Sequence, residues 1–321
     1  MKLATFSDAG VTRIGLVRMP EARILDLAAA GAGFATMLAL IDAGAAGLQL
    51  VREAAARHAA DSPAWRALAD VTLLAPLPQP RQMRDGMSFA THIRQSGAGM
   101  RRLQAMLAGA PLPELTPAAD IDPVYRQRPI YYITNRMSVG GPDSVVHWPA
   151  YSRVADYELE IAAIIGSPCR DIPAAEAGSH IFGYTIYNDF SARDIQMREM
   201  AGRLGPAKGK SFDGGNVLGP WIVTPDELPD PGALAVRVRV NGELRSSATT
   251  AGMLFGFPQI IAYIAQSETL HAGEVIGSGT VGNCCGLELG RFLRDGDVIE
   301  LEVDGIGTLR NRIAMPQGAA A

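Results

Sequence analysis

The chain has 321 residues, enough for one large domain or two smaller ones. Hydrophobic residues make up 48% of it and charged residues 19%, a globular balance that excludes a largely disordered chain. The net charge is −4, no block of lysine or arginine is present, and no apolar run reaches the ~20 residues that span a bilayer. Neither nucleic acid nor a membrane is therefore an expected partner.

The N-terminal part of the chain combines short strand patterns with one alanine-rich stretch. Strands are predicted at 2–6, 12–17, 23–27 and 71–74. Residues 28–60 carry apolar side chains at helical spacing, and Gly44 and Gly47 are expected to divide them into two helices. Alternating prolines then predict an extended connector that ends at residue 80. We expect residues 1–80 to form a small α/β N-terminal domain.

Residues 81–321 mix helices and strands without a regular βαβ alternation. Helical spacing predicts helices over 88–107 and 257–266. Short strand patterns recur at 130–133, 157–165, 181–187, 217–223, 234–240 and 298–303. Such mixing predicts an α+β domain whose mixed sheet curls into a roll or barrel.

The cysteines and the start of the chain bear on the cellular compartment. Cys169, Cys284 and Cys285 are odd in number and include an adjacent pair, which does not fit a disulfide framework. The segment 1–8 lacks the long apolar region of a signal peptide. We therefore expect a reducing, cytoplasmic location.

Two glutamates lie two positions apart in the segment 156–161. In a strand, side chains at i and i+2 share a face, so Glu158 and Glu160 would point the same way. One interpretation is a solvated face, which spacing alone favours. The other is a site for a hard cation, because oxygen ligands suit Mg²⁺, Ca²⁺ and Mn²⁺.

A dense polar cluster follows a strand pattern at 188–196. Asp189 and Arg193 fall at the expected boundary between a strand and a helix, where anions and polar ligands bind readily. Helix capping explains the same local pattern equally well. Residues 205–211 have nearly the spacing of a phosphate-binding loop, but they are one residue short of that motif and include a proline. Lys210 in this loop could instead bind a substrate carboxylate.

Two further segments carry candidate site residues. Asp85 is expected to cap a helix that carries His92 about two turns in, although an isolated histidine is better explained as a surface residue. Four glycines among residues 275–282 would let the backbone approach a ligand closely, and Thr280 could then hold carboxylate oxygens. A glycine-rich turn without a ligand explains the same pattern.

These segments form an ordered set of motifs. In chain order the set comprises Asp156-Tyr157-Glu158-Leu159-Glu160, Asn188-Asp189-Phe190-Ser191-Ala192-Arg193-Asp194-Ile195-Gln196, Gly209-Lys210-Ser211-Phe212, Leu218-Gly219-Pro220-Trp221, Gly277-Ser278-Gly279-Thr280 and Gly286-Leu287-Glu288-Leu289. The set closely resembles the fumarylacetoacetate hydrolase family, from about residue 81 to about residue 315. The string that begins at Asn188 is very specific, whereas the segment 1–80 resembles the variable leading domain of longer members much less specifically.

The resemblance implies a β-roll catalytic domain, a homodimer and a bound Mg²⁺, with Mn²⁺ or Ca²⁺ as alternatives. The residues implied as metal ligands are Glu158, Glu160, Asp189 and Asp85. Those implied for catalysis are His92 as general base, Glu288 as the residue that orients water with it, and Lys210. Those implied to bind substrate oxygens are Arg193, Gln196, Lys210 and Thr280.

The leading functional hypothesis is a hydrolase that cleaves a carbon–carbon bond in a small 1,3-diketo or acylpyruvate-type acid. His92 would take a proton from water, and the metal would stabilise the departing enolate. A second hypothesis is a decarboxylase, isomerase or hydratase of 2-oxo acids, and a third is a catalytically silent metal-binding scaffold. Departures from the family pattern at Gly86, Ala90 and Gln95 leave the substrate open.

Overall fold

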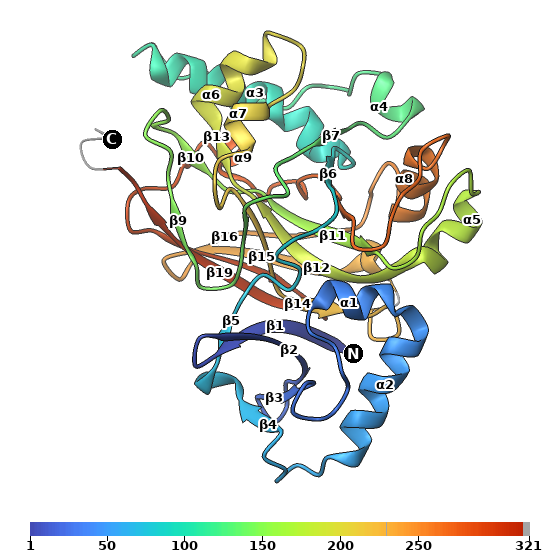
Figure 1. Cartoon of the computed structure of the whole chain (residues 1–321). Coiled ribbons are helices and arrows are strands. Elements are labelled where there is room, and N and C mark those ends of the chain that lie inside the picture. The colour runs from blue at the N-terminus through green and yellow to red at the C-terminus, as the bar shows by residue number, and fades with distance from the viewer. Residues whose placement is uncertain (229, 317–321) are drawn as a thin grey trace.

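Strands from distant parts of the chain join in one large mixed sheet. The computed structural model describes residues 1–228 and 230–316, and the strand order of this sheet is β4-β3-β2-β1-β14-β12-β11-β17-β6-β7 (Figure 1). β5 also pairs with β1, and β8 with β14. The strands are β1 (Lys2–Asp8), β2 (Val11–Arg18), β3 (Arg23–Asp26), β4 (Trp65–Ala67), β5 (Thr72–Leu73), β6 (Met83–Gly86), β7 (Tyr131–Ile133), β8 (Val139–Gly140), β11 (Leu159–Ile165), β12 (Ile181–Asp189), β14 (Asn216–Val223) and β17 (Val275–Gly277).

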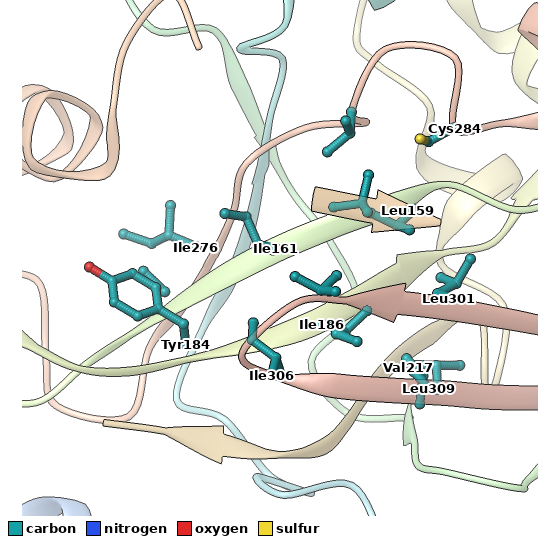
Figure 2. Close-up of a cluster of buried hydrophobic side chains, with 14 of the residues drawn as sticks. Leu159, Ile161, Tyr184, Ile186, Val217, Ile276, Cys284, Leu301, Ile306 and Leu309 are labelled. Atoms are coloured by element: carbon teal, nitrogen blue, oxygen red, sulfur yellow. The ribbon is translucent and has the colours of Figure 1, made fainter. Parts of the chain in front are cut away.

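A second sheet packs against one face of the first. Its strand order is β16-β15-β18-β19-β9. The strands are β9 (Val145–His147), β15 (Ala235–Val240), β16 (Glu243–Thr249), β18 (Val298–Val303) and β19 (Gly307–Ala314). Figure 2 shows Leu159, Ile161 and Ile186 of the large sheet in one buried cluster with Leu301 and Leu309 of the second sheet. The α+β prediction is confirmed, and in the described residues the sheets form an open roll without closing into a barrel.

The segment 1–80 contributes strands and two helices. β1 pairs with β14 in antiparallel register, so these strands continue the large sheet. The helices are α1 (Met37–Asp42) and α2 (Gly44–Arg57), and Thr36 caps the first. Helix formation begins later than the alanine-rich composition predicts, because Asp26 accepts hydrogen bonds from the backbone of the residues just after it and holds them in a turn. The domain boundary at residue 80 stays a prediction.

The remaining helices lie mainly at one end of the roll. Figure 1 shows α3 (Ala90–Leu107), α6 (Arg193–Met200), α7 (Ala207–Lys210) and α9 (Gly286–Leu289) gathered around the short pair β10 (Ala155–Asp156) and β13 (Ser191–Ala192). The others are α4 (Val124–Gln127), α5 (Ala174–Ala177) and α8 (Phe257–Ile264), with 3₁₀ turns η1 (Leu68–Asp70), η2 (Gly178–His180) and η3 (Pro231–Ala233). No helix among the described residues is both long and apolar enough to cross a membrane.

Candidate metal centre and catalytic dyad

Strand alternation brings two of the predicted acidic residues to one face of the large sheet. Leu159 and Ile161 of β11 point into the core between the sheets, so Glu160 points to the opposite face. Glu160 pairs with Tyr187 across the β11–β12 ladder, and Asp189 lies two residues further along β12. Glu160 and Asp189 therefore lie on the same face of neighbouring strands.

A glycine makes room for a third carboxylate on that face. β17 separates β11 from β6, and Gly277 of β17 is directly opposite Asp85 of β6. A Cβ atom at Gly277 would lie 2.5 Å from Asp85 Oδ1 and 2.9 Å from Glu160 Oε2. Because glycine leaves that position empty, the side chains of Asp85 and Glu160 can approach each other across β17.

Asp85, Glu160 and Asp189 form a buried carboxylate trio. Each offers an oxygen within 4.8 Å of the others. Asp85 Oδ1, Glu160 Oε1 and Asp189 Oδ1 are buried and have no hydrogen-bond partner among the described residues. Burial, and then the charge of Asp189, raise the pKa of Asp85 to about 7. Buried oxygens that lack donors and repel each other fit a hard divalent cation such as Mg²⁺ or Mn²⁺.

This electrostatic conflict predicts how stability should depend on pH. In the metal-free fold Asp85 stays protonated up to about pH 7, whereas an unfolded aspartate ionises near pH 3.9. The folded state thus binds more protons between these values, and metal-free stability should fall as pH rises through that window. A divalent cation needs the ionised carboxylates, so the gain in melting temperature on adding Mg²⁺ should be larger at pH 8 than at pH 6.

Differential scanning fluorimetry with Mg²⁺ or EDTA over a pH series measures this gain. At a free Mg²⁺ concentration of 100 times the Kd, binding adds about 2.7 kcal/mol to the free energy of unfolding. In a chain of this size that raises the melting temperature by several degrees. Asp85→Asn is the control, because it removes one titrating carboxylate of the trio and should reduce the pH dependence. A gain that is equal at all pH values would contradict the assignment of Asp85.

Glu158 faces the trio but already has two cationic partners. Its Oε1 accepts a hydrogen bond from Arg193 at 2.6 Å, and its Oε2 accepts one from Lys210 Nζ at 2.5 Å. Burial would raise the pKa of Glu158, but Arg193 and Lys210 outweigh burial and hold that pKa well below its usual value. Lys210 Nζ also bonds Asp189 Oδ2. Lys210 thus joins Glu158 to the trio, and the role of Glu158 as a metal ligand stays a prediction.

His92 and Glu288 form a buried dyad. His92 Nδ1 lies 3.0 Å from Glu288 Oε1, and Glu288 Oε2 accepts a hydrogen bond from the backbone of Cys285. Burial alone would lower the pKa of His92, but the Glu288 carboxylate, helped by Glu158, raises it above its usual value. An imidazole held at Nδ1 by a carboxylate has its other nitrogen free to exchange protons, as a general base requires.

The local setting of His92 differs from the sequence prediction in two ways. Asp85 does not cap the helix, because it lies inside β6, where it pairs with β7 and β17. Phe89 occupies the N-cap position and makes no side-chain capping bond, so His92 lies in the first turn of α3. The surface interpretation of His92 is also wrong, because its side chain is buried. Gly99 allows α3 to pack closely on Leu287 of α9, which brings Glu288 to His92.

The implied substrate-binding residues surround these groups. Arg193 donates to Gln196 Oε1 at 2.8 Å within α6, which orients both side chains. Thr280 is buried directly after Gly279, whose backbone N–H donates to Glu160 Oε2 at 2.9 Å. The structure therefore brings Arg193 and Lys210 to Glu158, Gln196 to Arg193, and Thr280 to the backbone that supports Glu160. Their contacts with substrate stay predictions.

Two polar residues of the site were missed from the sequence. Tyr132 donates its hydroxyl to Asp189 Oδ2 at 2.6 Å, which fixes that carboxylate. Asp156 is fully buried and accepts hydrogen bonds from Arg193 Nε at 2.7 Å and from the first two N–H groups of α9 at 2.6 and 2.8 Å. Asp156 thus ties the segment that carries Glu288 to the arginine that holds Glu158. The strand pairings that place these two residues leave no signal in the local sequence.

Comparison with known proteins shows the family to which this chain belongs. The profile described as Fumarylacetoacetate (FAA) hydrolase C-terminal matches residues 83–314. The chain belongs to the fumarylacetoacetate hydrolase family. An oxaloacetate tautomerase of Bacillus subtilis is 34% identical over 253 residues, which cover 77% of this chain and 74% of that protein.

Solved structures agree over nearly the whole chain. A fumarylacetoacetate hydrolase of Exiguobacterium antarcticum has a TM-score of 0.73 at 30% identity, covering 98% of this chain and 100% of that one. A maleylpyruvate hydrolase of Sphingobium sp. SYK-6 in complex with manganese(II) and pyruvate has a TM-score of 0.71 at 25% identity, covering 99% of this chain and 100% of that one. The predicted family and fold are confirmed, and these relatives of the fumarylacetoacetate hydrolase family are enzymes of small molecules.

Proposed function

We propose that this chain is a divalent-metal enzyme that catalyses keto–enol tautomerisation of a small 2-oxo acid of the oxaloacetate type. The observation that carries the proposal is the buried pair of His92 Nδ1 and Glu288 Oε1, 3.0 Å apart and beside Glu158. Such a pair supplies one oriented base next to a cation-binding cluster. The chain's similarity to an oxaloacetate tautomerase over 77% of its length supports the same reaction.

The carboxylate trio supports the proposed cation site. Asp85, Glu160 and Asp189, with Glu158 if Lys210 releases it, would hold the ion. A bound Mg²⁺ or Mn²⁺ supplies Lewis-acid polarisation of a carbonyl oxygen, which acidifies the neighbouring C–H bond. We expect Mg²⁺, with Mn²⁺ or Ca²⁺ as alternatives, because the trio offers only hard oxygen ligands.

The protein side chains would then position the substrate and move one proton. Lys210 and Arg193 supply positive charge for the substrate carboxylates, and Gln196 and Thr280 supply hydrogen bonds to its oxygens. His92 removes a proton from the carbon between the ketone and the distal carboxylate, and the protonated imidazole returns a proton to the ketone oxygen. The reaction conserves every atom of the substrate and needs no leaving group.

Hydrolysis of a carbon–carbon bond is the second candidate. The same dyad favours it, because Glu288 would hold His92 so that it deprotonates a water molecule. The hydroxide would attack the carbonyl of an acylpyruvate-type acid, and two acids would leave. Tautomerisation takes precedence because the Bacillus subtilis relative carries that name, whereas the sequence motifs by themselves favour hydrolysis.

One assay distinguishes the two reactions. The enol form of oxaloacetate is added to the enzyme with Mg²⁺ or Mn²⁺, or with EDTA, and loss of the enol absorbance is compared with the metal alone. Loss of the enol absorbance that is faster than with the metal alone, and without release of CO₂ or of two acids, supports the tautomerase. Release of two acids from fumarylpyruvate or another acylpyruvate, with no effect on oxaloacetate, would assign hydrolysis instead. Turnover of neither substrate would favour the silent scaffold.

The pH profile should report on the dyad. His92 acts as a base only when it is neutral, so kcat/KM should fall as pH drops through its raised pKa. Glu288→Gln removes the charge that raises this pKa. The fall in kcat/KM on the acidic side should therefore occur at lower pH, and the maximum kcat/KM should decrease. Gln95→Ala changes a residue on the same helix as His92 and is the control. It should not change the pH at which kcat/KM falls. If the acidic side of the kcat/KM profile of Glu288→Gln lies at the same pH as in the wild type, His92 is not the titrating base.

Three other properties are inferred from the family resemblance. We infer a homodimer and a cytoplasmic location, and we infer that residues 1–80 form a separate domain. Size-exclusion chromatography with light scattering tests the first of these directly.

A further inference from the structure

A second group of metal-binding side chains lies beside the carboxylate trio and differs from it in chemistry. His92, Cys285 and Glu288 each offer a donor atom, and these atoms lie within 4.8 Å of one another. All three side chains are buried. Cys285 Sγ lies 4.0 Å from His92 Nδ1, and Glu288 Oε1 lies 3.0 Å from the same nitrogen. We refer to His92, Cys285 and Glu288 as the soft triad.

The donor types of the soft triad select a different class of ion. Sulfur and imidazole ligands favour Zn²⁺ and other thiophilic ions, whereas oxygen-only sites favour Mg²⁺, Ca²⁺ and Mn²⁺. Zinc binds sulfur at about 2.3 Å and imidazole nitrogen at about 2.0 Å in tetrahedral sites, so such donors lie roughly 3.5 Å apart. The two observed separations, 3.0 and 4.0 Å, lie on either side of that value. Small side-chain shifts would therefore complete a three-ligand site.

We propose that the soft triad is an inhibitory site for zinc-class divalent cations. On binding, the Cys285 thiol loses its proton to solvent. His92 changes tautomer, releasing its Nδ1 proton and taking one up at Nε2, so that Nδ1 donates its lone pair while Glu288 supplies an oxygen. The ion would then occupy the place where Glu288 now holds His92, and His92 could no longer be oriented as a base. Binding is independent of the reaction catalysed, whereas inhibition rests on the function proposed for His92.

The surrounding charges are compatible with a cation. Arg193 is the cation that faces His92 and Cys285, and its repulsion would oppose binding. Its charge is neutralised by Asp156 at 2.7 Å and by Glu158 at 2.6 Å. Glu158 is also close enough to Cys285 to form a β-bridge with it through the backbone. Lys210 also pairs with Glu158, so the acidic groups Asp156, Glu158 and Glu288 around the triad exceed the cations Arg193 and Lys210 by one.

The adjacent cysteine provides a matched control. Cys284 is also buried, but its sulfur lies 3.7 Å from Ser246 Oγ and belongs to the apolar cluster between the sheets, as Figure 2 shows. Cys284→Ser and Cys285→Ser thus change the same atom in neighbouring residues, and only the second removes a donor from the soft triad. The backbone N–H of Cys285 that bonds Glu288 is retained in the serine variant.

The test uses Cd²⁺ and Zn²⁺ on the full chain with saturating Mg²⁺. Ultraviolet absorbance of a cadmium–thiolate bond reports binding without any activity. We expect it in the wild type and in Cys284→Ser, and we expect Cys285→Ser to lose it. The Zn²⁺ concentration that halves activity should rise roughly 10–100-fold in Cys285→Ser, at least the range that outer-shell changes cost metal sites.

Two results would overturn the proposal. The first is a wild-type protein without cadmium–thiolate absorbance, or with absorbance that survives in Cys285→Ser. The second is equal zinc inhibition of both variants, which would place the inhibitory ion at the carboxylate trio. A protein that turns over neither proposed substrate can still be tested by the absorbance, so failure of the proposed function is distinguishable from failure of this site.

Discussion

Replacing His92 with alanine is expected to lower kcat by about 10²–10⁴-fold, the range that a positioned acid–base group contributes. The imidazole is buried beside Glu288, so no other described histidine can take its place there. The carboxylate trio is built from β6, β11 and β12 and does not include His92. We therefore expect the variant to bind Mn²⁺ with nearly unchanged affinity in calorimetry.

A surface histidine gives the control for this variant. His180→Ala removes a half-buried imidazole remote from the trio, whose Nδ1 hydrogen-bonds Ser167, and it should retain full activity. Circular dichroism and melting temperature establish that both variants fold. If His92→Ala keeps more than a tenth of the wild-type kcat while binding Mn²⁺ normally, His92 is not the base, and the dyad has a structural role.

Gly277→Ala is expected to weaken Mg²⁺ binding by roughly 10–100-fold or more, the scale on which even outer-shell changes act. The added Cβ would lie 2.5 Å from Asp85 Oδ1 and 2.9 Å from Glu160 Oε2. These two neighbours are ends of side chains and can move aside, and the third, Tyr187 Cδ1 at 3.0 Å, has to shift by only a few tenths of an ångström, so the protein should still fold. The displaced oxygens are those on which a cation depends, so activity should fall and recover partly at high Mg²⁺.

Gly178→Ala is the matched control for that experiment. A Cβ there would meet Pro258 Cγ at 3.9 Å, an ordinary contact, so metal affinity and activity should not change. Isothermal titration calorimetry with Mg²⁺ or Mn²⁺ gives the affinities, and a melting curve gives the stability. Wild-type affinity in Gly277→Ala would mean that the cation does not lie among Asp85, Glu160 and Asp189.

Long, regular strands could be predicted from the sequence because alternation is a local signal. The predicted runs at 157–165, 181–187 and 217–223 match β11, β12 and β14 closely. The short strands β6 and β17 were missed, because four and three residues carry almost no periodicity. Their parallel pairing is a long-range contact, and it overrides the capping pattern that Asp85 shows locally.

In the candidate site too, features set by local sequence could be predicted, whereas contacts between distant residues could not. Spacing could place Glu158 and Glu160 on one face, and the ordered motifs carried the resemblance that implied His92 and Glu288. Spacing could not tell that Arg193 and Lys210 occupy both oxygens of Glu158, because those contacts join residues far apart in the chain. Nor could it find Cys285 beside His92, since the contact exists only where α3 packs on α9.

The two faces of β11 have a consequence for how this site can change during evolution. Leu159 and Ile161 fill the core of Figure 2, and Glu160 between them faces the carboxylates. A slip of one residue in the pairing of β11 with β12 would exchange the faces, burying a carboxylate in the apolar core and placing isoleucine among the acids. An insertion or deletion in this strand would therefore damage both the apolar core and the carboxylate site. New specificity has to arise by substitution, or by length changes in the connections that surround the site.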